Sequence, residues 1–440
     1  MNKHTKKNII INCILTLIIL IFAYLCIIKP TLETNTNTDT IDKSNSSSVQ
    51  EHTTISSTAT IGNMGDILIH SPILNAYYDT TSKTYDFEKI FTYIEPYIKK
   101  LDYSVINMEG SLTDNNFSGY PMFKCPENII DSAKKSGFRM FLTANNHSND
   151  NSSTGIVKTS EILNKKNVDY IGTRSKSETP KYIIKDINGI KVAMINYTYG
   201  KINDNGISSV NGLPCNLQTS TLLNVFDCER LDNFYTEQQE LINNMKKDGA
   251  DIIFYYIHWG IEYQTQENNI QRSIAQKLCD LGVDVIVGGH PHVIQPMDIL
   301  HSEISQKDTI CIYSLGNSIS NQRQELMNMK TGHTEDGVLF NVTLTKYSTG
   351  VVQPTKVEIL PTWVSRYFDK NNKIYQIVPL DKNIDWEHNF NLDMVPNGTN
   401  CANKSYERTT KLLLPGLHKI NNTLSEKLNE MYPEIYKKAQ

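Results

Sequence analysis

The stretch Val283–His292 reads Val-Asp-Val-Ile-Val-Gly-Gly-His-Pro-His, and it indicates the fold more clearly than any other part of the chain. Its apolar first half is typical of a buried strand, and the two glycines then permit a sharp turn. Two imidazoles, His290 and His292, therefore leave the strand end together, separated by the stiff Pro291. Neutral imidazole is a common ligand of divalent transition metals, so this strand end is a candidate metal site. The alternative is a polar turn, which a single His-x-His motif does not exclude.

Strands and helices alternate along the chain after residue 58, which predicts an α/β domain. Strands are predicted at 58–64, 103–107, 138–142, 251–257, 283–287, 309–313, 338–345 and 351–360, and helices at 87–100, 126–136, 155–166, 231–247, 271–281 and 425–437. Asn188-Gly189 lies between two apolar runs and predicts a β-hairpin. We expect residues 199–227 to form an irregular insert.

Polar side chains directly follow five of these strands. In an open α/β sheet the ligand crevice lies outside the carboxyl ends of the strands, so we expect these side chains to converge on one site. The residues are Asp66, Glu109, Asn146, His147, His258, His290 and His292. Two carboxylates, one amide and four imidazoles suit Mn, Fe, Zn or Mg-like ions better than a thiolate site would.

Such a set is able to hold one or two ions, and a shared carboxylate would bridge them. Two metals bind a phosphate or carboxylate oxygen, lower the pKa of water and stabilise the charge of an in-line displacement. His147 is then a candidate general acid. Each residue also has a structural interpretation: Asp66 and Glu109 are placed where carboxylates cap helices, and Asn146 tolerates left-handed turns.

The N-terminus predicts a membrane anchor. Residues 9–28 are almost wholly apolar and uncharged, and they are long enough to cross a bilayer. Lysines in residues 1–8 favour a cytoplasmic tail, which places the rest of the chain outside the cell. A cleavable signal peptide is the alternative. Residues 29–57 are rich in Thr, Ser and Asn and predict a flexible stalk.

Composition argues against two other classes of function. The net charge is −4 and no basic run lies beyond the N-terminal tail, so we expect no nucleic-acid partner. Six cysteines lie outside the apolar span and none forms a Cys-x-x-Cys pair, so we expect neither a thiolate zinc site nor a redox motif. Cys215 and Cys228 flank a short loop and are able to pair, but the sequence does not fix the connectivity.

Six short motifs occur in a fixed order. They are Gly-Asp (65, 66), Asn-x-Glu-Gly (107–110), Ala-Asn-Asn-His (144–147), His-Trp-Gly-x-Glu-Tyr (258–263), Gly-His-Pro-His (289–292) and Ser-Leu-Gly-Asn (314–317). Together they resemble the CapA family of capsular poly-γ-glutamate synthesis proteins, which are related to calcineurin-like metallophosphoesterases. The resemblance covers residues 58–360 and leaves 361–440 as a C-terminal extension.

The resemblance implies a four-layer α/β/β/α sandwich. It also implies a membrane-anchored protein of a Gram-positive-type cell that assists the assembly, export or anchoring of poly-γ-glutamate. The implied partners are the polymer, a polyglutamate synthetase and membrane export subunits. The metal residues carried over are Asp66, Asn146, His258, His290 and His292, with His147 as the acid.

Two positions depart from the phosphoesterase pattern. Leu68 stands where that pattern has a metal histidine, and Glu109 stands in place of its bridging aspartate. His70 is a possible substitute ligand. The retained His147 favours a metal-dependent hydrolase or transferase, whereas the missing ligand favours a scaffold that binds polymer carboxylates. A secreted metal-dependent phosphoesterase of unknown substrate is a further alternative.

Overall fold

The computed structural model describes residues 53–370 and 372–436. The predicted cytoplasmic tail and anchor, residues 1–28, lie outside these ranges, as does most of the predicted stalk. Strand β1 (Ile55–Leu68) begins within the predicted stalk, so that residues 55–57 belong to the strand. Of the helices in the described ranges, none combines the length and the apolar character needed to span a membrane.

The first of two large sheets has a parallel centre and an antiparallel side. Its strand order is β21-β20-β19-β1-β4-β7-β8, and β18 also pairs with β1. Strands β1, β4, β7 and β8 run parallel to one another, whereas β19, β20 and β21 are antiparallel. Besides β1, the bounds are β4 Tyr103–Glu109, β7 Met140–Leu142, β8 Asp169–Ile171, β18 Asn317–Ile319, β19 Asp336–Tyr347, β20 Val352–Asp369 and β21 Asn372–Pro379.

The second sheet has the order β12-β11-β10-β14-β15-β17-β16, with β9 and β13 also paired to β10. Its central strands β10, β14, β15 and β17 are parallel. The bounds are β9 Tyr182–Ile187, β10 Ile190–Ile202, β11 Ser208–Val210, β12 Leu213–Pro214, β13 Val225–Asp227, β14 Ile252–His258, β15 Val285–Gly289, β16 Ile294–Ser302 and β17 Lys307–Leu315.

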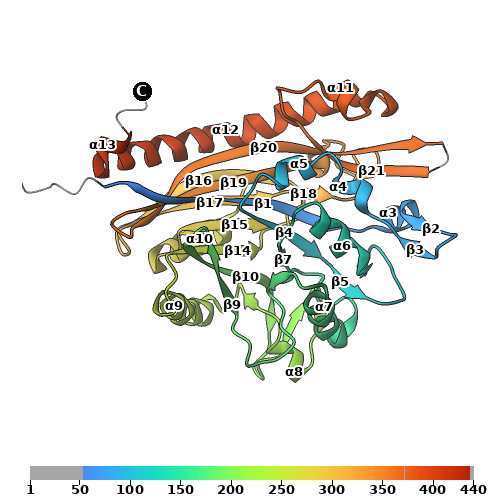
Figure 1. Ribbon diagram of the computed structural model, residues 1–440. Coiled ribbons are helices and arrows are strands. Elements are labelled where there is room, and N and C mark those ends of the chain that lie inside the picture. Colours follow the sequence, from blue (N-terminus) through green and yellow to red (C-terminus); the bar gives the residue numbers. More distant parts are fainter. Residues whose placement is uncertain (1–52, 371, 437–440) are drawn as a thin grey trace, which may run out of the picture. The chain divides into compact units, whose positions relative to one another are not determined.

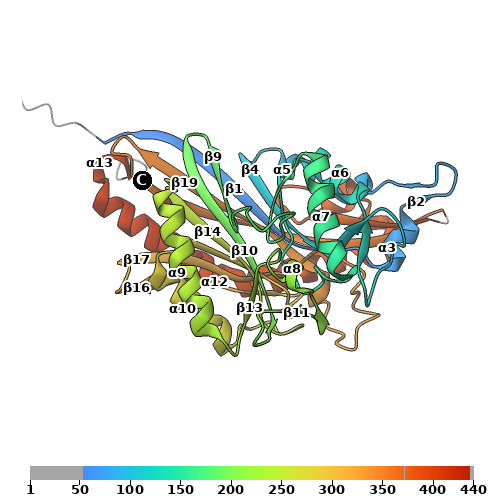
Figure 2. The same cartoon turned by 90° about the horizontal axis from the view of Figure 1, so that it is seen from below.

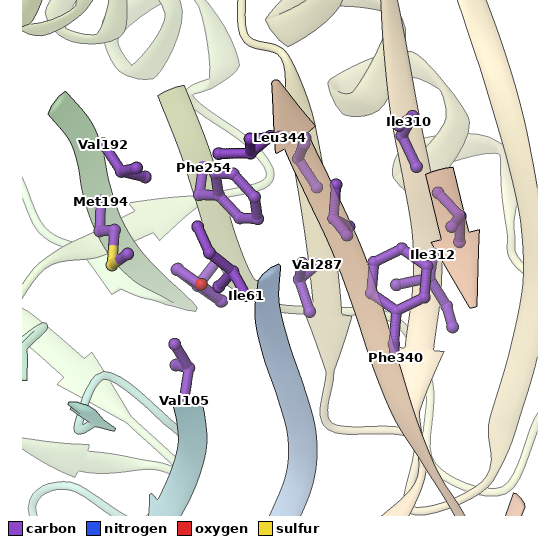
Figure 3. Packing of buried hydrophobic residues seen from close by; sticks show 14 of the residues in the cluster. Ile61, Val105, Val192, Met194, Phe254, Val287, Ile310, Ile312, Phe340 and Leu344 are labelled. Carbon is purple, nitrogen blue, oxygen red and sulfur yellow. The ribbon is translucent and has the colours of Figure 1, made fainter. Parts of the chain in front are cut away.

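A hydrophobic core joins the two sheets face to face. Ile61 and Val105 from the first sheet share one buried cluster with Val192, Phe254 and Val287 from the second. Figure 3 shows these side chains projecting from strands of both sheets into common space. Burial of each such side chain contributes about 1.5–3 kcal/mol, so this core is a main source of stability.

Helices cover the outer face of each sheet, as Figures 1 and 2 show. The first sheet packs against α3 (Ser71–Ala76), α4 (Glu88–Phe91), α5 (Glu95–Ile98), α6 (Asn128–Lys135) and α7 (Ser152–Lys166) through one cluster. The second packs against α9 (Leu231–Lys247) and α10 (Asn269–Leu281) through another. The mixed α/β class expected from the sequence is therefore confirmed.

The long helix α12 (Gly398–Met431) lies along β20 and β16, one strand from each sheet. Its Leu413, Ile420 and Leu424 belong to the core between the sheets. The boundary expected at residue 360 lies inside β20, so the segment after it completes the first sheet and covers the open side of the core.

Several elements differ from the sequence-based expectation. The helix predicted at 87–100 is two short helices, because Pro96 lacks an N–H and begins a new helical turn. The insert at 199–227, expected to be irregular, contains strands and the helix α8 (Leu217–Ser220). The hairpin predicted at Asn188-Gly189 is confirmed, because both residues of its turn have positive φ. The six cysteines in the described ranges are free. The remaining elements are β2 Tyr78–Asp79, β3 Thr84–Tyr85, β5 Ser111–Thr113, β6 Lys124–Pro126, α8 Leu217–Ser220, η2 His333–Glu335, α11 Trp386–Asn389, η3 Leu392–Met394 and α13 Pro433–Tyr436.

Candidate metal centre

The candidate ligands lie where parallel strands of both sheets end. Asp66 is near the end of β1, and Glu109 is the last residue of the neighbouring β4. From the second sheet, His258 is the last residue of β14, opposite Gly289 of β15. The sequence predicted convergence at strand ends, and the structure adds that the ligands come from two sheets.

The Gly-His-Pro-His segment has an unusual backbone. His290 has φ +99° and His292 has φ +56°, in a region of backbone conformation that residues other than glycine rarely occupy. The Trp259 N–H donates to the Gly289 carbonyl at 3.0 Å, and the Tyr263 N–H donates to the Pro291 carbonyl at 2.7 Å. Such conformations cost about 1–3 kcal/mol each and persist where surrounding contacts hold them, so the two imidazoles are fixed by the fold.

Two glycines allow this region to pack closely. A Cβ atom at Gly65 would lie 1.9 Å from the Gly316 carbonyl oxygen, and one at Gly288 would lie 2.0 Å from the Tyr313 carbonyl oxygen. Both distances are well inside van der Waals contact. These glycines therefore let β1 and β15 approach their neighbours directly before Asp66 and before the two histidines.

Glu109 lies at the centre of the site. It is fully buried, and in the described part of the chain neither carboxylate oxygen has a hydrogen-bond partner. Its Oε1 atom is 3.6 Å from Nε2 of His258 and 3.7 Å from Nε2 of His292. A buried carboxylate without partners is costly, and a cation among these atoms would relieve that cost.

The ligand atoms form two groups that share Glu109. One contains Glu109, His258 and His290, the other contains Asp66, Glu109 and His292, and within each group the ligand atoms lie within 4.8 Å of one another. Oδ1 of Asn146 is 2.9 Å from Nε2 of His258, which brings the amide to the first group. The structure thus brings together all six residues expected to hold a metal.

The charges of these residues also suit a cation. Burial and the neighbouring His258 and His292 hold the pKa of His290 well below its usual value, and its Nδ1 has no partner in the described structure. Burial raises the pKa of Asp66, but the hydrogen bond with His292 and the charge of His258 outweigh it and lower that pKa. His290 is therefore a neutral donor and Asp66 an ionised one.

His292, unlike His290, lies where positive charge is favoured. Burial lowers its pKa, but Glu109 and Asp66 overcome this effect and raise the pKa to about 9. Its Nδ1 atom is 3.2 Å from Oδ2 of Asp66. The carboxylates therefore stabilise a proton at the position where they would also stabilise a metal ion.

His147 lies outside both ligand groups and is held by a carboxylate. Its Nδ1 is 2.7 Å from Oδ2 of Asp150, which also accepts the Phe123 N–H at 2.5 Å. The Phe123 ring packs edge-on against the imidazole at 4.7 Å. Because Asp150 fixes the Nδ1–H tautomer, Nε2 of His147 is the nitrogen left to exchange a proton.

The two departures from the phosphoesterase pattern have a clear structural form. Leu68 is buried and apolar two residues after Asp66. His70 lies outside both groups, and its Nδ1 accepts the Asn321 N–H at 3.2 Å. The group containing Asp66 therefore has three side-chain donors, whereas the other group has four with Asn146.

Three residues outside the predicted set orient its members. Nδ2 of Asn107 donates to Asp66 at 2.7 Å, Oδ1 of Asn317 is 3.2 Å from Nδ1 of His292, and Asp150 holds His147. Asn107 and Asn317 stand in the quoted motifs, so the sequence carried a signal for them. The helix-cap interpretation does not hold for Glu109, which accepts no hydrogen bond from the described residues, and α3 begins after His70 rather than after Asp66.

Residues 60–322 match the family described as "Bacterial capsule synthesis protein PGA_cap". The chain belongs to this family. It is 26% identical over 333 residues to the PGA biosynthesis protein CapA of Bacillus subtilis strain 168, covering 74% of this chain and 78% of that protein. It is also 26% identical over 303 residues to the capsule biosynthesis protein CapA of Bacillus anthracis, covering 67% of each chain.

Among solved structures, the calcineurin-like phosphoesterase YfkN from Bacillus subtilis aligns with a TM-score of 0.38 and 15% identity, covering 81% of this chain and 99% of that one. The part that matches the PGA_cap family contains His147 and all six candidate metal residues. Helix α12 lies beyond it.

Proposed function

We propose that this PGA_cap protein supports the production of extracellular poly-γ-glutamate through a site that binds one or two divalent metal ions. The observation that carries the proposal is Glu109, a fully buried carboxylate without hydrogen-bond partners between two sets of histidines. The names of the two relatives, PGA biosynthesis protein and capsule biosynthesis protein, support the choice of polymer.

The residues fit a divalent ion of the Mn, Fe, Zn or Mg class. Carboxylate, amide and imidazole donors are those such ions take, and the buried atoms of Glu109 and His290 lack other partners among the described residues. The proposed ligands are Asp66, Glu109, Asn146, His258, His290 and His292. When bound, such an ion supplies a positive charge for carboxylate or phosphoryl oxygens.

Two modes of action remain, and the pair His147–Asp150 favours the catalytic one. A site that only binds carboxylates needs ligands but no imidazole with an orienting carboxylate, whereas a hydrolase or transferase needs a group that moves a proton. Here Oδ2 of Asp150 lies 2.7 Å from Nδ1 of His147 and keeps the proton on that nitrogen. A non-catalytic scaffold that binds the polymer is the second candidate, favoured by the three-donor group at Asp66.

The proposed location is the outer face of the cell membrane, with residues 9–28 as a single-pass anchor. The uncharged apolar run after a lysine-rich tail supports this topology. The proposed partners at that location are a polyglutamate synthetase and membrane export subunits, because a polymer emerging there would meet this domain first.

The test is complementation of a strain that lacks the gene. We expect His292→Ala to abolish surface polymer at an unchanged protein level, while His301→Ala, an exposed histidine paired with Asp308, leaves polymer unchanged. His147→Gln then separates the modes: polymer lost with metal retained supports catalysis, and normal polymer supports binding. If deletion of the gene leaves surface polymer unaltered, a metal-dependent phosphoesterase of another substrate becomes the better account.

A further inference from the structure

Helix α12 binds a buried carboxylate at the start of β19. Nε of Arg408 donates to Oδ2 of Asp336 at 2.8 Å, and its second nitrogen donates to Oδ1 at 2.7 Å. The same guanidinium donates to the Gly332 carbonyl at 3.2 Å. The Asp336 side chain is only 2% exposed, so this two-pronged pair fixes the start of β19 to the helix.

The contacts continue from Asp336 towards the site. Directly before Asp336 lies the 3-10 helix η2 (His333–Glu335), and its Thr334 carbonyl accepts a hydrogen bond from Nδ2 of Asn317 at 3.0 Å. The Thr334 hydroxyl also donates to the Gln322 carbonyl at 2.7 Å. Helix α12 therefore holds η2, and η2 holds the side chain of Asn317.

Asn317 in turn orients His292. Its amide nitrogen faces three acceptors, the carbonyls of His292 and Thr334 and Oε1 of Gln322, at 2.9–3.2 Å. Oδ1 must then be the atom that lies 3.2 Å from Nδ1 of His292. The other atom at 3.2 Å from Nδ1, Oδ2 of Asp66, is also an oxygen. Because oxygens accept, Nδ1 carries a hydrogen held between Asn317 and Asp66, and Nε2 is the nitrogen that remains towards Glu109, at 3.7 Å.

We propose that Arg408 is a positioning residue of the metal centre, acting through Asp336, η2 and Asn317 on the tautomer and orientation of His292. This inference rests on the proposed function in one respect, that the centre binds a metal ion. It assigns a role in the site to a helix outside the segment that matches the family. Groups that orient a metal-ligating histidine typically alter metal affinity by about 10–100-fold.

The experiment measures Co²⁺ binding to the full chain in detergent, by competition with a chelator and by the visible absorption of the bound ion. We compare the wild type with Asn317→Ala, Arg408→Met and the double variant. Lys419→Met is the control, because Lys419 lies on the same helix as Arg408, pairs at the surface with Asp298 of β16 at 2.5 Å and lies outside the path to His292. Near-ultraviolet circular dichroism establishes that each variant is folded.

We expect Asn317→Ala to weaken Co²⁺ binding by about 10–100-fold and Arg408→Met by a smaller factor in the same direction, with both changing the absorption bands. In the Asn317→Ala background, Arg408→Met should add little, because both act through one contact path. Lys419→Met should match the wild type. A purely structural salt bridge predicts additive effects and unchanged bands.

Arg408→Lys keeps the positive charge but loses the two-pronged geometry, and it serves as the second variant if Arg408→Met does not fold. An affinity between those of the wild type and Asn317→Ala supports the proposal. Wild-type affinity in every folded Arg408 variant, or additive effects in the double variant, overturns it while leaving the metal centre intact. Failure of the wild type to bind Co²⁺ overturns the metal proposal itself.

Discussion

Glu109 and His292 approach each other to 3.7 Å, between Oε1 and Nε2, although they lie at the ends of strands of different sheets. Glu109 ends β4 of the first sheet, and His292 lies just after β15 of the second. The two sheets therefore meet at this pair through polar atoms, next to a core that is otherwise apolar. A cation shared by the pair would link the two sheets directly.

We expect Glu109→Gln to abolish tight metal binding. The change keeps the shape but removes the one charge that both ligand groups share. Affinity should fall by more than about 100-fold, since loss of an orienting group alone costs about 10–100-fold. The loss should appear as a lower metal content in elemental analysis of the purified full chain. Glu303→Gln, which changes an exposed carboxylate, is the control. Unchanged metal content in Glu109→Gln would contradict the assignment of the centre.

The two ligand groups should differ in affinity. One offers four side-chain donors including Asn146, and the other offers three because Leu68 is apolar. Titration of Mn²⁺ against a chelator should show one tight ion and one weaker ion per chain.

Leu68→His should strengthen the weaker site, because residues 66 and 68 of a strand point to the same side. The expected result is a rise in tightly bound Mn²⁺ from about one to two ions per chain. The matched control is Ile67→Val, one position away on the opposite face of β1, where the side chain packs in the helix-covered cluster. Equal stoichiometry in Leu68→His and wild type would argue against the missing-ligand interpretation.

Asp150→Asn should impair polymer production without loss of metal. The carboxylate holds the Nδ1–H tautomer of His147 at 2.7 Å, and an amide in its place no longer favours that tautomer. We expect polymer production to fall at least about tenfold while metal content stays at the wild-type level. Polymer released per cell and elemental analysis are measured on the same cultures. A combined loss of metal and polymer would instead place Asp150 in the support of the ligands.

The stability of Arg408→Met should depend on pH. Burial raises the pKa of Asp336 to about 6 in spite of Arg408, above the ordinary value of 3.8. A carboxyl group with a raised folded-state pKa favours folding below pH 3.8, and this contribution is lost as the pH rises through 6. Removal of Arg408 raises the folded-state pKa further and deepens that loss.

We therefore expect Arg408→Met to lower the free energy of unfolding by about 3–5 kcal/mol at pH 8. At pH 4 the carboxyl is protonated in the folded chain, and the loss should be about 1–3 kcal/mol. Urea unfolding at both values checks the difference, with Lys419→Met as the surface control. A loss that is the same at both pH values would show that Asp336 is not the group responsible.

The proposed topology is tested by protease added to intact cells without their walls. Because the lysine-rich tail precedes an uncharged apolar run, we expect the domain after residue 58 to be digested while a cytoplasmic protein stays intact. Full protection of the domain would contradict an extracellular location.

The sequence predicted that polar residues near strand ends converge, because an apolar run followed by polar residues is a local pattern. The predicted helix at 231–247 has the bounds of α9, and each predicted ligand lies near the end of a strand. Helix α12 was predicted only from residue 425, since Pro415 and many Asn and Thr residues weaken the helical pattern. Burial against β20 and β16 overrides those preferences, and burial of this kind is a long-range effect that local spacing does not encode.

The partners of the ligands were beyond the sequence for the same reason. Asn317 and Asn107 stood in visible motifs, but the ligand that each one orients depends on which strands pair. Asp66 of β1 pairs with Asn107 of β4 on one side and with Asn317 of β18 on the other, and local spacing does not encode this arrangement. Leu68 was recognised as a departure, and only the coordinates establish that His70 is engaged by the Asn321 N–H instead.

Asp66 and His292 form a contact across 226 positions of sequence. A growing or partly translocated chain therefore has no complete centre, because Asp66 is synthesised long before His292. The ion would be acquired only after both sheets have closed on each other, from whatever pool surrounds the finished domain. The choice of metal in the living cell would then follow the compartment in which folding ends.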